Sequence, residues 1–193
     1  MPSPSRTGVS KQLLRIFATR YACGSFSHVC GLLCASVLAV VFVPTPAAEA
    51  GDADQVVMTL PGALVRARDG DDVAVGQVRV RLHGVDAFER NQTCERGGET
   101  WRCGTAAQDA LQALVAGKDI TCIVVDADRY GRPIGKCTAD GVDLNDAMVR
   151  SGLAVAYRHY SSDYVAAEKE AIDAKRGAWA GTFTMPWVWR KQH

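Results

Sequence analysis

Three charged clusters between residues 69 and 132 contain the side chains that chemistry at a phosphate group requires. They are Asp69-Gly70-Asp71-Asp72, the segment from Arg81 to Glu89, and Asp128-Arg129-Tyr130-Gly131-Arg132. Carboxylates are ligands that hard divalent cations such as Ca²⁺ prefer, and the forked guanidinium group of arginine binds phosphate oxygens in pairs. The clusters therefore suggest a site for a divalent cation and a phosphate group.

Five side chains of these clusters could divide that chemistry among them. Asp71 and Asp86 could provide two carboxylates to one cation if their turns meet. Arg81 and Arg132 could bind the phosphate group and stabilise its charge, and Glu89 could orient or deprotonate water. Taken one at a time, these residues also fit a plain hairpin turn, a solvated strand face or a surface acid.

The elements that must position these side chains follow from local patterns. Residues 64–68 and 73–75 have strand character, and the turn between them contains an Asp-Gly pair, which favours tight hairpins. Residues 77–85 alternate between apolar and basic side chains. A period of two predicts a half-buried strand, with Arg81 facing outward or into a cleft.

The remaining elements are helices and strands separated by turns. After a long connection over residues 86–102, we expect helices over residues 105–116, 143–151 and 162–177, and strands over residues 120–125 and 134–138. Short strands with appended helices predict an α+β fold whose sheet closes as a small barrel.

The first fifty residues have the three parts of a secretory signal peptide. Basic residues come first, an apolar run covers residues 31–43, and Ala48-Glu49-Ala50 provides a cleavage site of the A-x-A type. The apolar run is shorter than the roughly 20 residues of a membrane span. We therefore expect export to a periplasm or to the medium, with cleavage near Ala50. An uncleaved membrane anchor is the alternative.

The rest of the chain divides into three parts of unequal length. Residues 51–61 are interpreted as a leader, residues 62–180 as the folded domain, and residues 181–193 as a Trp-rich C-terminal tail. Tryptophans near a terminus more often dock on the domain than bind a ligand.

Four cysteines follow residue 50, and an even number in an exported domain suggests disulfides. Of about three possible connectivities, we favour the pairing of neighbours, which joins Cys94 to Cys103 and Cys122 to Cys137. A zinc site is disfavoured because no C-x-x-C pair is present and the histidines do not recur at a zinc-binding spacing.

The net charge argues against nonspecific electrostatic binding of nucleic acid. The chain carries a formal charge of +1, and residues 1–50 contain four basic residues and one acid, which leaves −2 on the remainder. Proteins that coat nucleic acid are usually basic. Contact with phosphate must therefore come from a local group of side chains.

Taken together, the motifs resemble the thermonuclease (staphylococcal-nuclease-like) family over about residues 62–180. The matching order is D-G-D, R-L-x-G-V-D-A-x-E, D-R-Y-G-R and N-D-A-M-V-R-S-G-L-A. The resemblance implies an α+β fold with a five-stranded OB-type β-barrel and three helices. It also implies a Ca²⁺-dependent endonuclease that hydrolyses DNA and RNA, with single strands favoured and little sequence preference. No feature predicts an obligate protein partner.

The resemblance assigns the metal ligands first. Asp71 and Asp86 would bind Ca²⁺ through their carboxylates, and Ala87 would bind it through its backbone carbonyl. Asp69 would support the turn that carries the first ligand.

The resemblance also assigns the groups that act on the substrate. Arg81 and Arg132 would clamp the scissile phosphate, and Glu89 would be the general base or hold the attacking water. Electrostatic stabilisation suits Arg132 better than proton donation, because arginine barely releases protons. The nucleotide contacts would come from Arg129, Tyr130 and Tyr157.

Two positions depart from the family pattern. Phe88 stands where D-x-P-E would have proline, which leaves the turn before Glu89 less fixed. Asp72 stands where threonine is usual, and its carboxylate either strengthens metal binding or points to solvent.

Two other functions compete with the nuclease hypothesis. One is a non-catalytic OB-fold module in the cell envelope that binds nucleic acid or another partner. The other is a membrane-tethered envelope protein with a structural or interaction role. Binding of a divalent ion at Asp71 and Asp86 would separate the first from a nuclease, and the mature N-terminus would decide the second.

Overall fold

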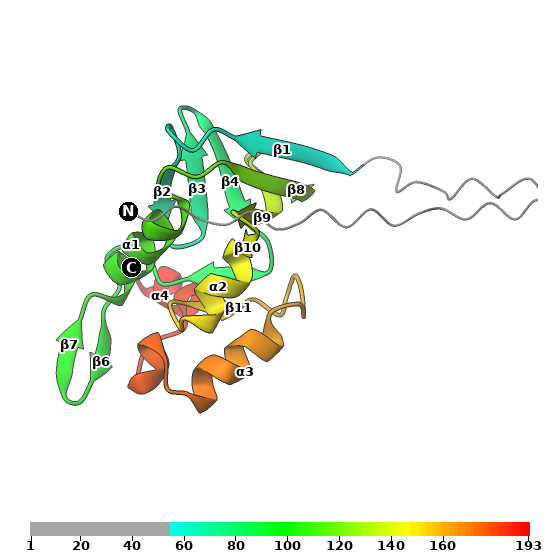
Figure 1. Cartoon of the computed structure of the whole chain (residues 1–193). Coiled ribbons are helices and arrows are strands. Elements are labelled where there is room, and N and C mark those ends of the chain that lie inside the picture. Colours follow the sequence, from blue (N-terminus) through cyan, green and yellow to red (C-terminus); the bar gives the residue numbers. More distant parts are fainter. Residues whose placement is uncertain (1–54) are drawn as a thin grey trace, which may run out of the picture. The chain divides into compact units, whose positions relative to one another are not determined.

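The structure is a computed structural model that describes residues 55–193 (Figure 1). The predicted signal peptide (residues 1–50) and the start of the predicted leader lie outside the described residues. Across residues 55–193, no helix combines the length and the apolar character needed to cross a membrane.

Most strands belong to one sheet, in the order β1-β8-β9-β4-β3-β2, with β10 paired to β9. Neighbouring strands are antiparallel except β4 and β9, which are parallel. The strands are β1 (Val56–Leu60), β2 (Arg66–Asp69), β3 (Asp72–Val75), β4 (Val78–Leu82), β8 (Ile120–Ala127), β9 (Pro133–Ala139) and β10 (Val142–Asp143). The first strand lies in the segment interpreted as a leader.

Two short strand pairs and the helices complete the fold. The pairs are β5 (Val85–Ala87) with β11 (Ala154–Ala156), and β6 (Cys94–Arg96) with β7 (Glu99–Trp101). The helices are α1 (Cys103–Val115), α2 (Leu144–Arg150), α3 (Val165–Asp173) and α4 (Pro186–Gln192), with a 3₁₀ turn, η1 (Gly177–Ala180).

The structure confirms a mixed α+β fold and corrects the predicted barrel. Within residues 55–193, β1 and β2 are the two ends of the sheet order and do not pair with each other, so the barrel is not closed. This sheet has seven strands instead of five, and the described part of the chain has four α-helices instead of three. The additions were missed because a single short apolar run such as β1 and a seven-residue helix such as α4 lack a clear periodic signal.

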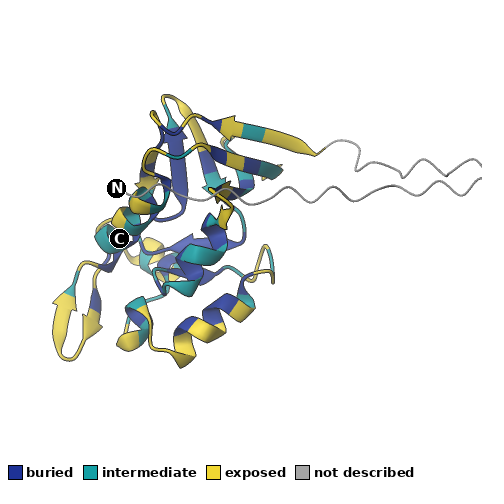
Figure 2. Cartoon of the chain, in the orientation of Figure 1, coloured by how far each residue is buried: buried dark blue, intermediate teal, exposed yellow. Residues whose placement is uncertain are grey.

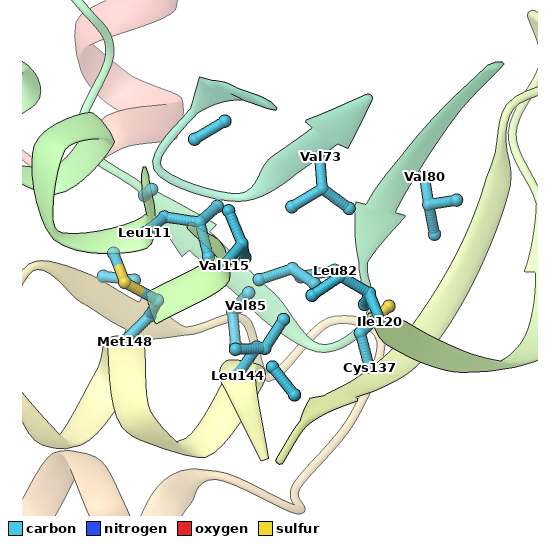
Figure 3. Packing of buried hydrophobic residues seen from close by; sticks show 14 of the residues in the cluster. Val73, Val80, Leu82, Val85, Leu111, Val115, Ile120, Cys137, Leu144 and Met148 are labelled. Atoms are coloured by element: carbon cyan, nitrogen blue, oxygen red, sulfur yellow. The ribbon is translucent and has the colours of Figure 1, made fainter. Parts of the chain in front are cut away.

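The core lies between the sheet and the helices (Figures 2 and 3). In α1, Ala107, Leu111 and Val115 recur every fourth residue and are fully buried, which explains why this Ala- and Leu-rich segment is an amphipathic helix. The predicted alternation of β4 holds at Val80 and Leu82, which are buried, whereas Val78 at the strand's start is half exposed.

Both predicted disulfides are confirmed. Cys122 lies directly opposite Cys137 on the paired strands β8 and β9, so their bond joins two neighbouring strands of the main sheet. Cys94 and Cys103 join β6 to the first residue of α1. This second disulfide belongs to a small separate core, here called the rim cluster, formed by Phe88, Cys94, Cys103 and Ala178, with Trp101 and Phe183 packed against it.

Candidate functional site

The three charged clusters meet at one cavity of about 860 Å³. The turn between β2 and β3, strand β4, the segment after β5 and the turn between β8 and β9 all line it. Its lining includes most of the predicted site residues, namely Asp69, Asp71, Arg81, Ala87, Glu89, Arg129, Tyr130, Arg132 and Tyr157. Asp86 is fully buried and does not line the cavity, although its carboxylate contacts a side chain that does.

Arg81 joins the two predicted metal ligands. Its Nη1 donates to Oδ1 of Asp71 at 3.1 Å, and its Nη2 donates to Oδ1 of Asp86 at 2.9 Å. The same Nη2 lies 3.0 Å from Oδ2 of Asp71. The backbone fixes this arrangement, because the amide of Leu82 donates to the carbonyl of Asp71 at 2.8 Å and the amide of Ala87 donates to Oδ2 of Asp71 at 3.1 Å.

Burial controls the electrostatics of this pair. Asp71 is 5% exposed and Asp86 is 0% exposed. Burial raises the pKa of Asp71 to about 7; the charge of Arg81 opposes that rise and the charge of Asp86 adds to it. A neighbouring positive charge stabilises the ionised form of such a carboxyl group.

The donor set fits a hard cation in part. Oδ2 of Asp71 and Oδ1 of Asp86 both lie next to Nη2 of Arg81. A small cation in the place of that nitrogen would therefore contact both carboxylates. No group of three His, Cys, Asp or Glu side chains able to hold a metal is found among residues 55–193. Ca²⁺ also accepts backbone carbonyls and water as ligands, so two carboxylates need such groups to complete the shell.

Asp72 neither faces solvent nor lies beside Asp71 as a further cation ligand. Instead, its carboxylate forms ion pairs with Arg79 and Arg132. Its side chain is 2% exposed, and its Oδ2 accepts from Nη1 of Arg132 at 2.9 Å and from Nη2 of Arg79 at 2.5 Å. Asp128 holds the other side of Arg132, accepting from its Nε at 2.7 Å. Sequence reasoning missed these two positioning roles, although the D-x-x-x-R spacing of the turn was a signal for the second.

Asp69 forms a hydrogen bond within its own turn. Its Oδ1 accepts from the amide of Gly70 at 2.9 Å, and it pairs in register with Asp72 across the turn. Burial raises the pKa of Asp69, and the hydrogen bond from Gly70 partly offsets that rise.

Burial fixes the turn before Glu89, at the Phe88 position that departs from the D-x-P-E pattern. Phe88 is 0% exposed and meets the ring of Phe183 edge-on, with centroids 5.0 Å apart. Gln92, also fully buried, accepts from the amide of Glu89 at 3.1 Å and donates to the carbonyl of Thr184 at 2.6 Å. The rim cluster therefore anchors the backbone of Glu89 without the restricted φ of proline.

The C-terminal helix contributes a residue that sequence reasoning did not identify. Arg190 of α4 donates to Oδ1 and Oδ2 of Asp86 at 3.0 and 2.9 Å, and to Oε1 of Glu89 at 2.5 Å. Only the Trp-rich composition of residues 181–193 hinted that this segment docks.

The predicted nucleotide contacts differ in how accessible they are. Tyr130 is 71% exposed, and the guanidinium of Arg129 lies over its ring, 4.8 Å from the centroid. Tyr157 is covered on one face by Trp187, whose ring is nearly parallel at 10° with centroids 5.4 Å apart. The ring of Tyr130 is thus open to solvent beside Arg129, whereas one face of the Tyr157 ring is covered.

Known proteins are similar in sequence to the part of the chain that forms this cavity. Residues 79–181 match the family model described as staphylococcal nuclease homologue. A protein named "Uncharacterized endonuclease" from Escherichia coli O157:H7 is 39% identical over 137 residues, which cover 67% of this chain and 84% of that relative. "Probable staphylococcal-like nuclease CAN1" of Oryza sativa subsp. japonica is 34% identical over 125 residues, covering 63% of this chain and 35% of the relative.

A third relative extends over more of the chain. "Protein ParB" of Escherichia coli is 33% identical over 180 residues, which cover 83% of this chain and 91% of the relative. The family match includes Arg81, Asp86, Glu89 and Arg132 and ends before α4.

Proposed function

Because the chain belongs to the staphylococcal nuclease family, we propose that it is a Ca²⁺-dependent endonuclease that hydrolyses phosphodiester bonds of DNA and RNA. The observation that carries this proposal is the meeting of Asp71, Arg81, Arg132 and Glu89 around one cavity, with the buried Asp86 paired to Arg81. Cations around the equatorial phosphate oxygens and a positioned water are what phosphodiester hydrolysis requires.

The two arginines enter the cavity already oriented for phosphate. Arg81 is held by the buried carboxylates beneath it, and Arg132 is held by Asp72 and Asp128. A guanidinium held in advance loses less side-chain freedom when it binds phosphate, and it stabilises the charge that develops on the oxygens.

Glu89 accepts the proton of the attacking water. The water oxygen forms a bond to phosphorus in line with the leaving oxygen, the bond from phosphorus to that oxygen breaks, and the leaving oxygen takes a proton from solvent. Ca²⁺ held by Asp71, Asp86 and the carbonyl of Ala87 would supply additional positive charge to the phosphate oxygens. The family resemblance implies products with 3′-phosphate ends.

Substrate binding depends on stacking and on few direct contacts. The exposed Arg129–Tyr130 pair beside the cavity offers a flat surface to an unpaired base. Stacking tolerates every base, and an unpaired base reaches such a surface more readily than a paired one. We therefore propose single strands as the favoured substrate, with little sequence preference.

We also propose that the protein is exported. The support is the signal-like composition of residues 1–50 and the two disulfides, since disulfides persist in oxidising compartments. Sequencing of the mature N-terminus checks this, and a chain that retains residues 31–43 would favour the membrane anchor instead.

Digestion of single-stranded DNA by the exported form tests the nuclease proposal. We expect cleavage with Ca²⁺, none with a chelator, and a loss of about 10²–10⁴-fold in rate for Glu89→Gln if Glu89 is the base. The matched control is Glu99→Gln, an exposed acid on β7 outside the cavity, which should cleave at the original rate. An unchanged rate for Glu89→Gln would show that the role assigned to Glu89 is wrong.

The non-catalytic binding module remains the second candidate, and one observation favours it. Arg190 already occupies both oxygens of Asp86 and one oxygen of Glu89. A folded protein that binds single-stranded DNA in Ca²⁺ and leaves it intact would support this candidate.

A further inference from the structure

Arg190 forms ion pairs with Glu89 and Asp86, the carboxylates that the proposed function assigns to catalysis and to the cation. Its two Nη atoms reach both oxygens of Asp86, and one of them also reaches Glu89. Arg81 takes a second position on Oδ1 of Asp86. The carboxylate of Asp86 therefore has a guanidinium donor on each oxygen, and Glu89 is tied to the same guanidinium.

Four further contacts seat this segment on the domain. Trp187, three residues before Arg190 and so on the same face of α4, stacks on Tyr157. Pro186 is buried, Phe183 packs on Phe88, and the carbonyl of Thr184 accepts from Gln92. A helix of seven residues has little stability by itself, so these contacts and the ion pairs of Arg190 must hold it in place.

A docked Arg190 and a bound cation exclude one another at Asp86. Calcium binds carboxylate oxygens at 2.3–2.6 Å, which is shorter than the 2.9 and 3.0 Å that now separate those oxygens from Arg190. The cation would have to lie between the carboxylate and a guanidinium of the same sign. Release of the helix removes the repulsion from Arg190 and leaves Arg81 as the one guanidinium on Asp86 among the described residues. It also uncovers the ring face of Tyr157.

We propose that Arg190 and a divalent cation compete for Asp86, so that α4 must leave its docked position before the cation binds. The inference rests on the proposed function, because it presupposes a cation site at Asp86. It concerns residues beyond the segment that matches the family model. Docking of α4 therefore raises the cation concentration at which the site is filled.

Titration calorimetry with Ca²⁺ on the exported form tests the competition. We expect Arg190→Ala to bind Ca²⁺ about tenfold more tightly, the factor expected if the docked form is about nine times as populated as the undocked form. Trp187→Ala leaves every charge in place and loosens the seat of the helix, so it should bind about threefold more tightly.

Lys191→Ala is the matched control for charge. It removes one positive charge from the next residue of α4, which is exposed and makes no ion pair with Asp86. We expect less than a twofold change, because an exposed charge is screened. If Arg190→Ala and Lys191→Ala change the affinity equally, or if Trp187→Ala has no effect, the competition is overturned.

Hydrogen exchange provides a readout that needs neither a variant nor activity. Addition of Ca²⁺ to the unaltered protein should speed amide exchange in residues 187–192, because the displaced helix loses its contacts. Exchange that is unchanged or slower in Ca²⁺ would overturn the inference. If calorimetry detects no Ca²⁺ binding to any form, the cation assignment of the proposed function fails, and the competition fails with it. Equal binding by all forms overturns the competition alone.

Discussion

The cavity has two walls that are built differently. The inner wall consists of Asp71, Asp72, Arg81 and Arg132 on the main sheet and its turns. The outer wall consists of Glu89 and Arg190, which belong to the segment Phe88–Gln92 and to α4. The inner-wall carboxylates Asp71 and Asp72 are 5% and 1% exposed; Asp71 lies in the turn between β2 and β3, and Asp72 begins β3, which is paired on both sides. The outer wall rests on the four buried residues of the rim cluster and one disulfide.

The difference shows in the two arginines that share Asp86. The side chain of Arg81 is 24% exposed and contacts two buried carboxylates, whereas that of Arg190 is 37% exposed and comes from the terminal helix. Regions with few buried apolar contacts open at a lower free energy than the core. The inner wall is therefore suited to hold charges at fixed positions, and the outer wall is suited to move.

Replacement of Arg81 by alanine should have the largest effect. It removes a phosphate-binding group and leaves two buried carboxylates without their shared partner. We expect a loss of about 10³-fold in cleavage rate and of about 3–5 kcal/mol in the free energy of unfolding. Arg190→Ala should cost less than about 1 kcal/mol, because the pair is partly exposed. Denaturant unfolding of both variants measures this, and equal destabilisation would contradict the distinction between the walls.

Asp72→Asn tests whether the inner wall positions Arg132. The amide keeps the shape of the side chain and loses the charge that pairs with Arg132, so we expect cleavage to fall about 10–100-fold with the affinity for Ca²⁺ unchanged. Asp126→Asn, an exposed residue that also lines the cavity, is the control and should cleave normally. A matching loss of Ca²⁺ affinity in Asp72→Asn would mean that Asp72 binds the cation.

Phe88→Ala tests how far the outer wall depends on the rim cluster. Removing a fully buried ring should lower the free energy of unfolding by about 3–5 kcal/mol, and a mobile Glu89 should lower kcat about tenfold. Phe88→Leu fills much of the same space and should keep most of the activity. Steady-state kinetics and thermal unfolding provide the measurement. A normal kcat in a destabilised Phe88→Ala would show that Glu89 is positioned by other contacts.

Removal of either disulfide should have the smallest effect on the cleavage rate. The two removals should also differ, one lowering mainly stability and the other lowering the rate. The sequence separation between Cys122 and Cys137 is 15, and replacement of both by serine should cost about 3 kcal/mol, with the rate at 25 °C unchanged. Replacement of Cys94 and Cys103 should lower the rate a few-fold, because that bond belongs to the rim cluster beside Glu89. If the first pair changes the rate more than the second, the outer wall is not the mobile one.

Local features of the chain could be predicted because their causes are local. The alternation in residues 77–85 predicted β4. The helix expected over residues 143–151 is α2, and the side chain of Asp143 caps it by accepting from the amide of Asp146 at 3.0 Å. Pairing of neighbouring cysteines was also correct. The charged clusters indicated which residues meet, since each ends a strand or forms a turn.

The burial of single groups could be decided only by tertiary structure. Asp72 looked equally suited to metal binding and to solvent, and it is the fold that places it between Arg79 and Arg132. Phe88 looked like a weakness of its turn, and a contact with Phe183 makes it an anchor. In both cases the deciding partner lies in another element of the chain.

By itself, the sequence indicated the mixed α+β class, the favoured disulfide pairing and most of the charged residues at the site, because periodicity, spacing and residue type act over short stretches. Only the tertiary structure decided that the sheet does not close between β1 and β2 and that α4 reaches the carboxylates. Arg190 and Asp86 are 104 residues apart. A contact of that separation leaves no periodic pattern in the chain, since it depends on the packing of everything between its two ends.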